Sequence, residues 1–270
     1  MTAHVRRQRF DLHAAGRRLH AERLTPSHAA AGPVLVFLHE GLGSIGQWGA
    51  FPAHLCARTR LPGLVYERWG YGRSEGLTGP RVEDYLQREA EDSLPEVLAA
   101  SGIAEPPILF GHSDGGSIAL LFAAAYPEQA CAVVSEAAHV LIEECCLTGI
   151  RRAGDAYQQG EWRTRLQRHH GDNVDLMFWG WHDIWLNPAR HQWNIEAELR
   201  RILCPTLIIQ GEDDEYGTRA QVDAITAGVS GPADVLWLPG CGHAPHHQLR
   251  ETVLNTVAHF IGGVCAKISR

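Results

Sequence analysis

Long apolar runs are missing from the beginning of this sequence. Although 45% of the 270 residues are hydrophobic, no apolar stretch as long as a secretory leader or a membrane-spanning helix follows the first residues. We therefore expect a soluble, cytoplasmic protein that does not bind a membrane. The apolar content is sufficient for one large core, so we expect a single domain over residues 1–270.

An excess of positive charge is also missing. The chain has 24 Lys and Arg against 31 Asp and Glu, which gives a formal net charge of −7. Because nucleic acids and anionic membranes attract basic surfaces, we expect neither as a partner and predict a small molecule instead. Several arginines gather near the start, where "RFDLHAAGRRLHAERL" (9–24) alternates and predicts two strands with a turn near Ala15 and Gly16.

The spacings that cysteine and histidine adopt in metal and redox sites are missing as well. The seven cysteines are irregularly placed, and Cys145 and Cys146 are adjacent rather than separated as in C-x-x-C, so we predict reduced thiols. Histidine pairs such as His169–His170 have no cysteine or acidic partners at zinc spacing. No metal and no organic cofactor is predicted.

Short apolar runs that end at turns recur along the chain. They occupy 32–40, 63–67, 106–112, 131–138, 205–211 and 233–240. Segments with helical periodicity lie between and after them, at 83–101, 114–126, 217–228 and 248–262. With the opening pair, this alternation predicts an α/β fold, a mostly parallel eight-stranded sheet flanked by helices, with ligand chemistry at the carboxyl ends of the strands.

One long stretch, at about 139–200, interrupts the alternation. It has no strand candidate, and it carries five of the eight tryptophans, namely Trp162, Trp179, Trp181, Trp185 and Trp193. We predict a helical cap insertion over the strand ends. The tryptophans either pack on one another or line a cavity, and we expect at least two to face a ligand with an apolar or aromatic part, with Trp179, Trp181 and Trp185 as candidates.

A G-x-S-x-G pattern joins the strand at 106–112 to the helix at 114–126. A serine at the tip of so sharp a turn needs a strained backbone, and glycines two residues before and after it, here Gly111 and Gly115, avoid a steric clash. The amide of Asp114 then lies at the start of a helix, where negative charge is favoured. The pattern predicts that Ser113 is a nucleophile.

A nucleophilic serine needs a base, and the base needs a carboxylate that orients it. In this strand–turn–helix arrangement the partners follow the serine in the order acid, then histidine. Asp213 and Asp214 follow the strand at 205–211, and His243 follows the strand at 233–240. Either aspartate can supply the acid on this argument.

Five motifs in order resemble those of the α/β-hydrolase superfamily, over nearly the whole chain. They are "FLHEGLGS" (37–44), "YERWGYGRS" (66–74), "GHSDG" (111–115), "GEDD" (211–214) and "GCGHAP" (240–245). The resemblance implies that Ser113 is the nucleophile, His243 the base and Asp214, rather than Asp213, the acid. It also implies an oxyanion hole made by the backbone amides of Asp114 and Gly41, with Leu42 as the next candidate.

The roles of two carboxylates near this site, Glu40 and Asp114, each have two interpretations. Glu40 replaces a glycine of the superfamily's pattern, and we expect its side chain to turn away and pair with Arg68 or Arg73; the alternative is a substrate contact. Asp114 is either a solvated carboxylate in the first turn of its helix or a partner for a cationic group, such as an amine, on the substrate. Leu42 is a further candidate contact.

The nucleophile restricts the chemistry that the resemblance implies. A serine, rather than an aspartate, argues against the haloalkane dehalogenase and epoxide hydrolase branches. The leading prediction is hydrolysis of a small carboxylic ester, thioester or lactone through an acyl-enzyme on Ser113. Carbon–carbon bond hydrolysis is disfavoured by Ala244 after the histidine. Acyl transfer, perhydrolysis and a ligand-sensing protein remain open, as does the oligomeric state.

Overall fold

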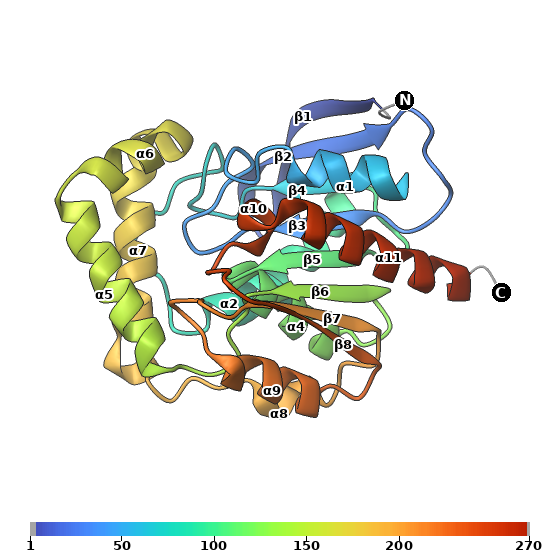
Figure 1. The fold of residues 1–270 in the computed structure, drawn as a ribbon. Coiled ribbons are helices and arrows are strands. Elements are labelled where there is room, and N and C mark those ends of the chain that lie inside the picture. The colour runs from blue at the N-terminus through green and yellow to red at the C-terminus, as the bar shows by residue number, and fades with distance from the viewer. Residues whose placement is uncertain (1–3, 269–270) are drawn as a thin grey trace.

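A single eight-stranded sheet forms the centre of the structure, a computed structural model that describes residues 4–268. Its strand order is β1-β2-β4-β3-β5-β6-β7-β8 (Figure 1). The strands are β1 Val5–Ala14, β2 Arg17–Pro26, β3 Leu35–Leu38, β4 Gly63–Tyr66, β5 Ile108–His112, β6 Ala132–Glu136, β7 Thr206–Gly211 and β8 Ala233–Leu238. Strands β3 to β8 are parallel where they pair, which confirms the predicted α/β fold.

The first two strands form the predicted hairpin. β1 pairs antiparallel with β2, and β2 pairs antiparallel with β4, so the hairpin extends one edge of the sheet. Ala15 and Gly16 have φ values of 50° and 70°, and two consecutive residues in this region make the two-residue turn that matches the twist of a hairpin.

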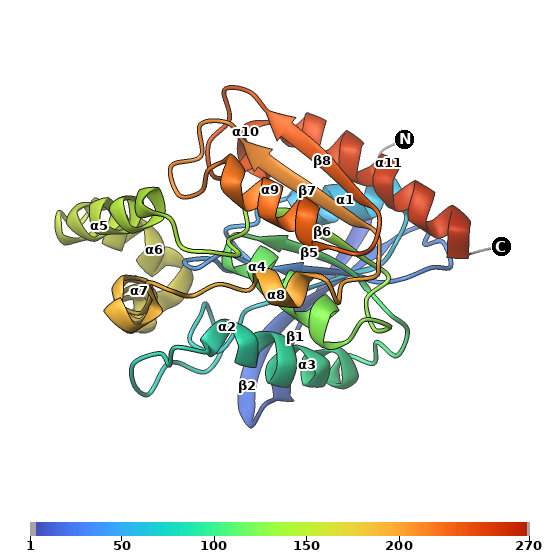
Figure 2. The same ribbon diagram turned by 90° about the horizontal axis from the view of Figure 1, so that it is seen from below.

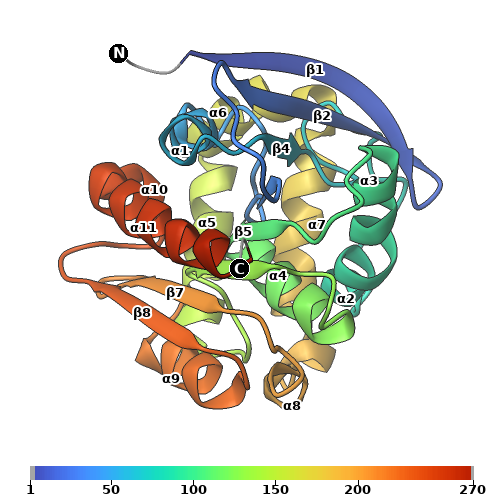
Figure 3. The same cartoon turned by 90° about the vertical axis from the view of Figure 1, so that its right-hand side faces the viewer.

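Helices cover both faces of the sheet, as Figure 3 shows from one end. On one face lie α1 Phe51–Thr59 and α11 Arg250–Ile268, preceded by the short α10 Pro245–Gln248. On the other lie α2 Tyr85–Arg88, a π-helical turn Glu89–Ser93, α3 Leu94–Ala100, α4 Asp114–Ala125, α8 Glu196–Leu199 and α9 Arg219–Gly228. Each face has its own apolar core, so both sides of the parallel strands are buried.

The insertion between β6 and β7 is helical, as predicted. It contains α5 Glu144–Gln158, α6 Glu161–His170 and α7 Val174–Leu186, with two 3₁₀ turns at Gly171–Asn173 and Pro188–Arg190. Figures 1 and 2 show these three long helices as a separate layer at one end of the sheet. We call this layer the cap. Over the residues that the structure describes, no helix combines the length and apolarity needed to cross a membrane.

Candidate active site

Ser113 lies at the tip of a sharp turn between β5 and α4. Its φ of 53° is in the left-handed region, which a residue with a side chain rarely adopts. A side chain on Gly111 would overlap the backbone of Gly115, and one on Gly115 would overlap the backbone of Leu38. Both glycines are therefore sterically required, and together they let the turn present the serine at the carboxyl end of the sheet.

Three side chains that are far apart in the sequence form one hydrogen-bonded chain. His243 Nε2 is 3.0 Å from Ser113 Oγ, and His243 Nδ1 is 2.8 and 2.9 Å from the two carboxylate oxygens of Asp214. Because that carboxylate accepts, Nδ1 carries the proton and Nε2 is free to accept from the serine. This is the geometry of a nucleophile, a base and an orienting acid.

The structure places Asp214, and not Asp213, against the histidine. The side chain of Asp214 is fully buried and also accepts hydrogen bonds from the Tyr216 amide (2.8 Å) and Gln210 Nε2 (2.7 Å). Burial alone would raise the pKa of Asp214, but the charge of His243 and the hydrogen bonds outweigh it and hold the pKa at about 2. Asp213 is exposed to solvent. Gln210, near the end of β7, donates to Asp214 and not to Asp213, and so holds Asp214 in place.

The two segments that carry the predicted oxyanion amides line the same cavity as the serine. Asp114 is the first residue of α4, and the first amides of a helix have no partner within it. Gly41 lies on the loop after β3, where a side chain would overlap the indole of Trp181 from the cap. Ser113, Asp114, Gly41 and Trp181 all line the same cavity, so the cap closes directly over the loop that carries Gly41.

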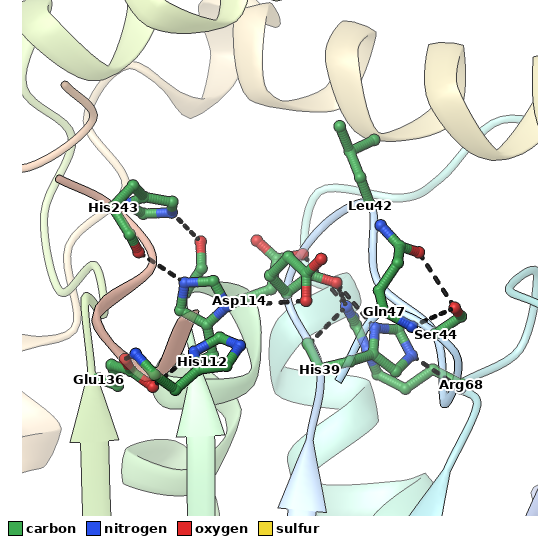
Figure 4. A network of polar contacts seen from close by, with 12 residues as sticks. His39, Leu42, Ser44, Gln47, Arg68, His112, Asp114, Glu136 and His243 are labelled. Atoms are coloured by element: carbon green, nitrogen blue, oxygen red, sulfur yellow. Dashed lines mark hydrogen bonds and ion pairs between the residues drawn. The ribbon is translucent and has the colours of Figure 1, made fainter. Parts of the chain in front are cut away.

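The pairing expected for Glu40 is wrong. Its carboxylate does not pair with Arg68 or Arg73; Glu40 Oε2 lies 3.6 Å from His112 Nδ1. Arg68 instead donates to the backbone oxygens of His39 (3.2 Å) and Glu40 (2.9 Å) and so fixes the loop (Figure 4). Arg68 donates to backbone oxygens of the loop rather than to the Glu40 carboxylate. The positive charge that faces Glu40 is therefore that of His112, the residue before the nucleophile.

His112 and Glu40 form an ion pair in the wall of the cavity. His112 Nε2 is 2.7 Å from the backbone oxygen of His243, so this nitrogen carries a proton (Figure 4). The other ring nitrogen, Nδ1, is the one that faces Glu40. Burial lowers the pKa of His112, but the carboxylates of Glu40 and Glu136 outweigh burial and raise it to about 9. Burial raises the pKa of Glu40, yet His112 holds it well below its usual range. At neutral pH the pair carries no net charge.

Of the two interpretations of Asp114, the solvated carboxylate is wrong. The side chain is buried, accepts a hydrogen bond of 2.7 Å from Tyr85 Oη, and lies 3.6 Å from Arg68 Nη2. Arg68 is itself fully buried, so the two charges offset each other inside the protein. Asp114 is paired and almost fully buried, so its carboxylate is less accessible to a substrate amine than that of Glu40, a quarter of whose side chain is exposed.

The cavity above the serine has a volume of about 400 Å³. Its walls are largely apolar or aromatic and include Leu42, Cys146, Ile150, Trp162, Trp181 and Trp185. Trp179 and Trp193 do not line it; Trp179 packs edge-on against Tyr157 and Phe178 within the cap. Glu40, Gln47 and Gln248 give the lining a polar part.

Among the lining residues that were not predicted from the sequence, His139 and Tyr216 lie beside His243. His139, three residues after the end of β6, donates from Nε2 to the Tyr216 backbone oxygen (3.0 Å), and the Tyr216 ring lies 4.6 Å from the His243 ring. Their positions just beyond the ends of β6 and β7 could have identified them as site residues, because side chains at the carboxyl ends of parallel strands meet at one site.

A cap histidine fastens the cap to the loop after β3. His170, at the end of α6, is buried and accepts a hydrogen bond of 2.9 Å at Nδ1 from the Gly72 amide. Its Nε2 must then carry the proton, which it donates to the Leu42 backbone oxygen (3.0 Å). Burial lowers the pKa of His170 to about 4, so the ring is neutral at physiological pH and keeps this arrangement.

The strand order, the turn at Ser113 and the acid–histidine–serine chain together define an α/β-hydrolase. The model of the alpha/beta hydrolase family matches residues 35–255, and the chain belongs to that family. The resemblance predicted from the five motifs is therefore confirmed.

Curated relatives match only part of the chain. The 2-succinyl-6-hydroxy-2,4-cyclohexadiene-1-carboxylate synthase of Yersinia pseudotuberculosis is 37% identical over 109 residues, which are 40% of this chain and 37% of that protein. The enzyme of the same name from Yersinia pestis gives the same values. The chain thus spans little more than a third of the length of these synthases.

Solved structures match over almost the whole chain. A serine hydrolase involved in carbazole degradation has a TM-score of 0.76 at 16% identity, and covers 95% of this chain and 99% of its own. The enol-lactonase from Burkholderia xenovorans has a TM-score of 0.73 at 17% identity, and covers 94% of this chain and 100% of its own. At this identity the similarity establishes the fold.

Proposed function

We propose that the chain is a serine hydrolase that cleaves a small carboxylic ester, thioester or lactone through an acyl-enzyme on Ser113. The observation that carries the proposal is the continuous hydrogen-bonded chain from Ser113 Oγ through His243 to Asp214. A free serine is a weak nucleophile, and an adjacent neutral imidazole held by a carboxylate supplies the base that it needs.

In the proposed reaction, Ser113 Oγ attacks the substrate carbonyl while His243 Nε2 takes its proton. The amides of Asp114 and Gly41 bind the oxyanion, and each such donor contributes about 3 kcal/mol to a serine hydrolase's transition state. The resulting imidazolium is stabilised by Asp214 and protonates the leaving group. Water, deprotonated by His243, then attacks the acyl-enzyme and releases the acid.

The cavity supports an apolar or aromatic substrate of small size. Leu42, Trp181 and Trp185 offer apolar surface to the acyl or leaving group, and the cavity volume is within the range of small-molecule sites. Glu40 reaches the cavity with a quarter of its side chain exposed, so it replaces Asp114 as the proposed contact for a donor or a cation on the substrate.

A second candidate function is a synthase-like reaction that forms a cyclohexadiene carboxylate, since the partial similarity to the Yersinia synthases favours it. The cavity lining is less suited to a carboxylated ligand, because it includes Glu40 and Glu215, and Arg165 is its only arginine or lysine among residues 4–268. We therefore rank ester hydrolysis first.

The test is labelling of Ser113 with a fluorophosphonate and a turnover screen. The screen covers aryl esters of increasing chain length, thioesters, lactones and aminoacyl esters, with Ser113→Ala as the inactive control. We expect labelling and turnover that the control lacks. Labelling without turnover of any acyl substrate would contradict the proposal and favour a ligand sensor or the synthase-like reaction.

A further inference from the structure

A second, smaller cavity lies on the far side of the loop that follows β3. Its volume is about 180 Å³. Four separate segments of the chain enclose it: the opening hairpin, the loop after β3, the turn after β4 and the end of α6 in the cap. Its lining residues are Arg9, His20, Ser44, Ile45, Gly46, Glu67, Arg73, Arg168 and His169.

Basic side chains dominate this lining, although the chain as a whole has a net charge of −7. Three arginines and two histidines contribute to it, against one acid, Glu67. Because guanidinium groups offer several donors in a plane that matches the oxygens of phosphate and carboxylate, such a lining favours an oxyanion.

The single acid of the cavity has its oxygens engaged elsewhere. Glu67 Oε1 accepts from the Ile45 amide (3.1 Å), and Glu67 Oε2 accepts from the Arg73 amide (2.6 Å). Burial raises the pKa of Glu67, and the two amides together with the charges of His20 and Arg73 oppose that shift. Backbone amides hold both oxygens of this carboxyl group, and three arginines line the cavity beside it, so the lining keeps an excess of positive charge.

His20 supplies a buried nitrogen that has no partner. The side chain is about nine-tenths buried, and Nδ1 lies 2.7 Å from Asp11 Oδ1. Its other nitrogen, Nε2, is buried without a hydrogen-bond partner among residues 4–268. A buried polar atom of this kind normally has a partner. Because Nδ1 gives its proton to Asp11, Nε2 is an acceptor, and it indicates a ligand that brings a hydroxyl group, as a protonated phosphate oxygen does.

We propose that this cavity binds a small oxyanion, a phosphate or a carboxylate group, held by Arg73, Arg168 and His169, with His20 Nε2 accepting from a hydroxyl of the ligand. Arg9 contributes less because it already shares Glu22 with Arg7, at 3.1 Å from Glu22 Oε1. The group arrives either as a free anion or as the acidic end of a larger ligand, and both sources present the same oxygens to the same donors.

Anion binding connects the cap to the loop beside the nucleophile. Arg168 and His169 directly precede His170, which bonds the Leu42 backbone, and Ser44 to Gly46 continue the loop that carries Gly41. An anion between these segments holds the end of α6 against that loop. An effect on turnover rests on the proposed hydrolase function, whereas binding of the anion does not.

The test compares sodium phosphate with sodium chloride at equal ionic strength, by thermal unfolding and titration calorimetry. We expect saturable stabilisation by phosphate, both in the unaltered chain and in Ser113→Ala, because a ligand of the folded state raises Tm. Arg73→Gln and Arg168→Gln should each weaken phosphate binding about tenfold, which corresponds to the loss of one charge-assisted contact.

Two features keep the test decisive. Both arginines are exposed, so neither substitution is expected to unfold the chain, and Arg219→Gln, on an exposed side chain of α9, is the matched control that should bind phosphate normally. Equal stabilisation by chloride and phosphate, or unchanged phosphate affinity in both variants, overturns the proposal. Phosphate binding without any esterase activity keeps the site and contradicts the proposed function instead.

Kinetics with the best ester then distinguishes the two sources of the oxyanion. Inorganic phosphate that raises KM without changing kcat competes with substrate, which assigns the site to an acidic end of the substrate. Phosphate that changes kcat binds together with the substrate rather than in place of part of it, which assigns the site to a free anion. Either pattern should disappear in Arg73→Gln with Arg168→Gln.

Discussion

Asp213 and Asp214 are chemically identical neighbours with different surroundings. Asp214 is buried and bonded to His243, whereas Asp213 faces solvent. Asp214→Asn replaces an acceptor of the Nδ1 proton by an amide that can stabilise the wrong tautomer of His243. We expect kcat to fall about 10⁴-fold in Asp214→Asn.

The matched control is Asp213→Asn, measured with the same ester. Its kcat should remain within about threefold of the unaltered chain, since a solvated surface charge contributes little. A larger loss in Asp213→Asn than in Asp214→Asn would reverse the assignment of the acid.

Glu40 gives a second prediction at this scale. Glu40→Gln keeps the shape of the side chain and removes the charge that faces His112 and the cavity. We expect kcat/KM for an aminoacyl ester to fall about tenfold relative to an isosteric neutral ester, as a partly desolvated charge pair is lost. The ratio of the two kcat/KM values is the readout, and an unchanged ratio would show that Glu40 does not select the substrate.

Single residues differ in how far the sequence could predict them. Ser113, Asp214 and His243 follow from motifs at strand ends, because the turn and the order of the strands dictate where such residues meet. The partners of Glu40 and Asp114 do not follow from any motif. His112 and Tyr85 reach those carboxylates only after segments distant in the sequence are packed together, and no local pattern encodes which neighbour arrives.

Among the elements, the contact of α7 with the loop after β3 is the most restrictive. Trp181 fills the space where a side chain at position 41 would lie. Gly41→Ala should therefore displace the cap or the loop and lower kcat/KM about 10- to 100-fold, since small displacements of positioning groups are costly.

A double substitution separates this contact from other effects of Gly41→Ala. Trp181→Ala removes the obstructing indole, so Gly41→Ala should cost less in that background than alone. The coupling is measured as the difference between the two losses in kcat/KM. Equal losses in both backgrounds would show that Trp181 is not the obstacle.

Elements with strong periodicity were predicted well. The hairpin, the parallel strands and the helices α4 and α9 lie where alternation and apolar spacing place them. Helix α1 was missed because it is nine residues long and has a proline in its first turn, which is compatible with a helix start but resembles a loop. The π-helical turn at Glu89–Ser93 was also missed, because apolar spacing does not distinguish it from an α-helix.

For the whole molecule, two buried histidines with opposite pKa shifts predict how stability depends on pH. The pKa of His112 is raised from about 6.5 to about 9, so its contribution is complete below about pH 6.5 and is lost as pH rises through 9. The pKa of His170 is lowered to about 4, so its contribution is complete above about pH 6.5 and is lost as pH falls through 4.

The free energy of unfolding, followed by thermal unfolding between pH 4 and 10, should therefore have a maximum near pH 6.5. Each limb of this pH profile should lower it by up to about 3 kcal/mol at full titration. Buried His39 and His139, whose pKa values are also lowered by burial, add to the acid limb. Glu40→Gln should flatten the alkaline limb, and His170→Gln should flatten part of the acid limb. Unchanged limbs in both variants would contradict these roles.

The overall architecture was predictable because a parallel sheet with crossover helices is dictated by alternating strands and helices. The placement of the cap on the sheet was not. It depends on contacts such as His170 with Leu42 and Gly72, which join residues about a hundred positions apart and leave no periodic trace in the sequence.

The packing of Trp181 against Gly41 has a practical consequence for experiments on the intact protein. An indole that rests on the loop beside the nucleophile will change its surroundings whenever the cap lifts or a ligand enters. Its emission is therefore an internal optical signal for opening. Stopped-flow fluorescence can follow that opening without any attached dye. Trp181→Phe keeps the other seven tryptophans, so the difference between the two signals is the contribution of Trp181.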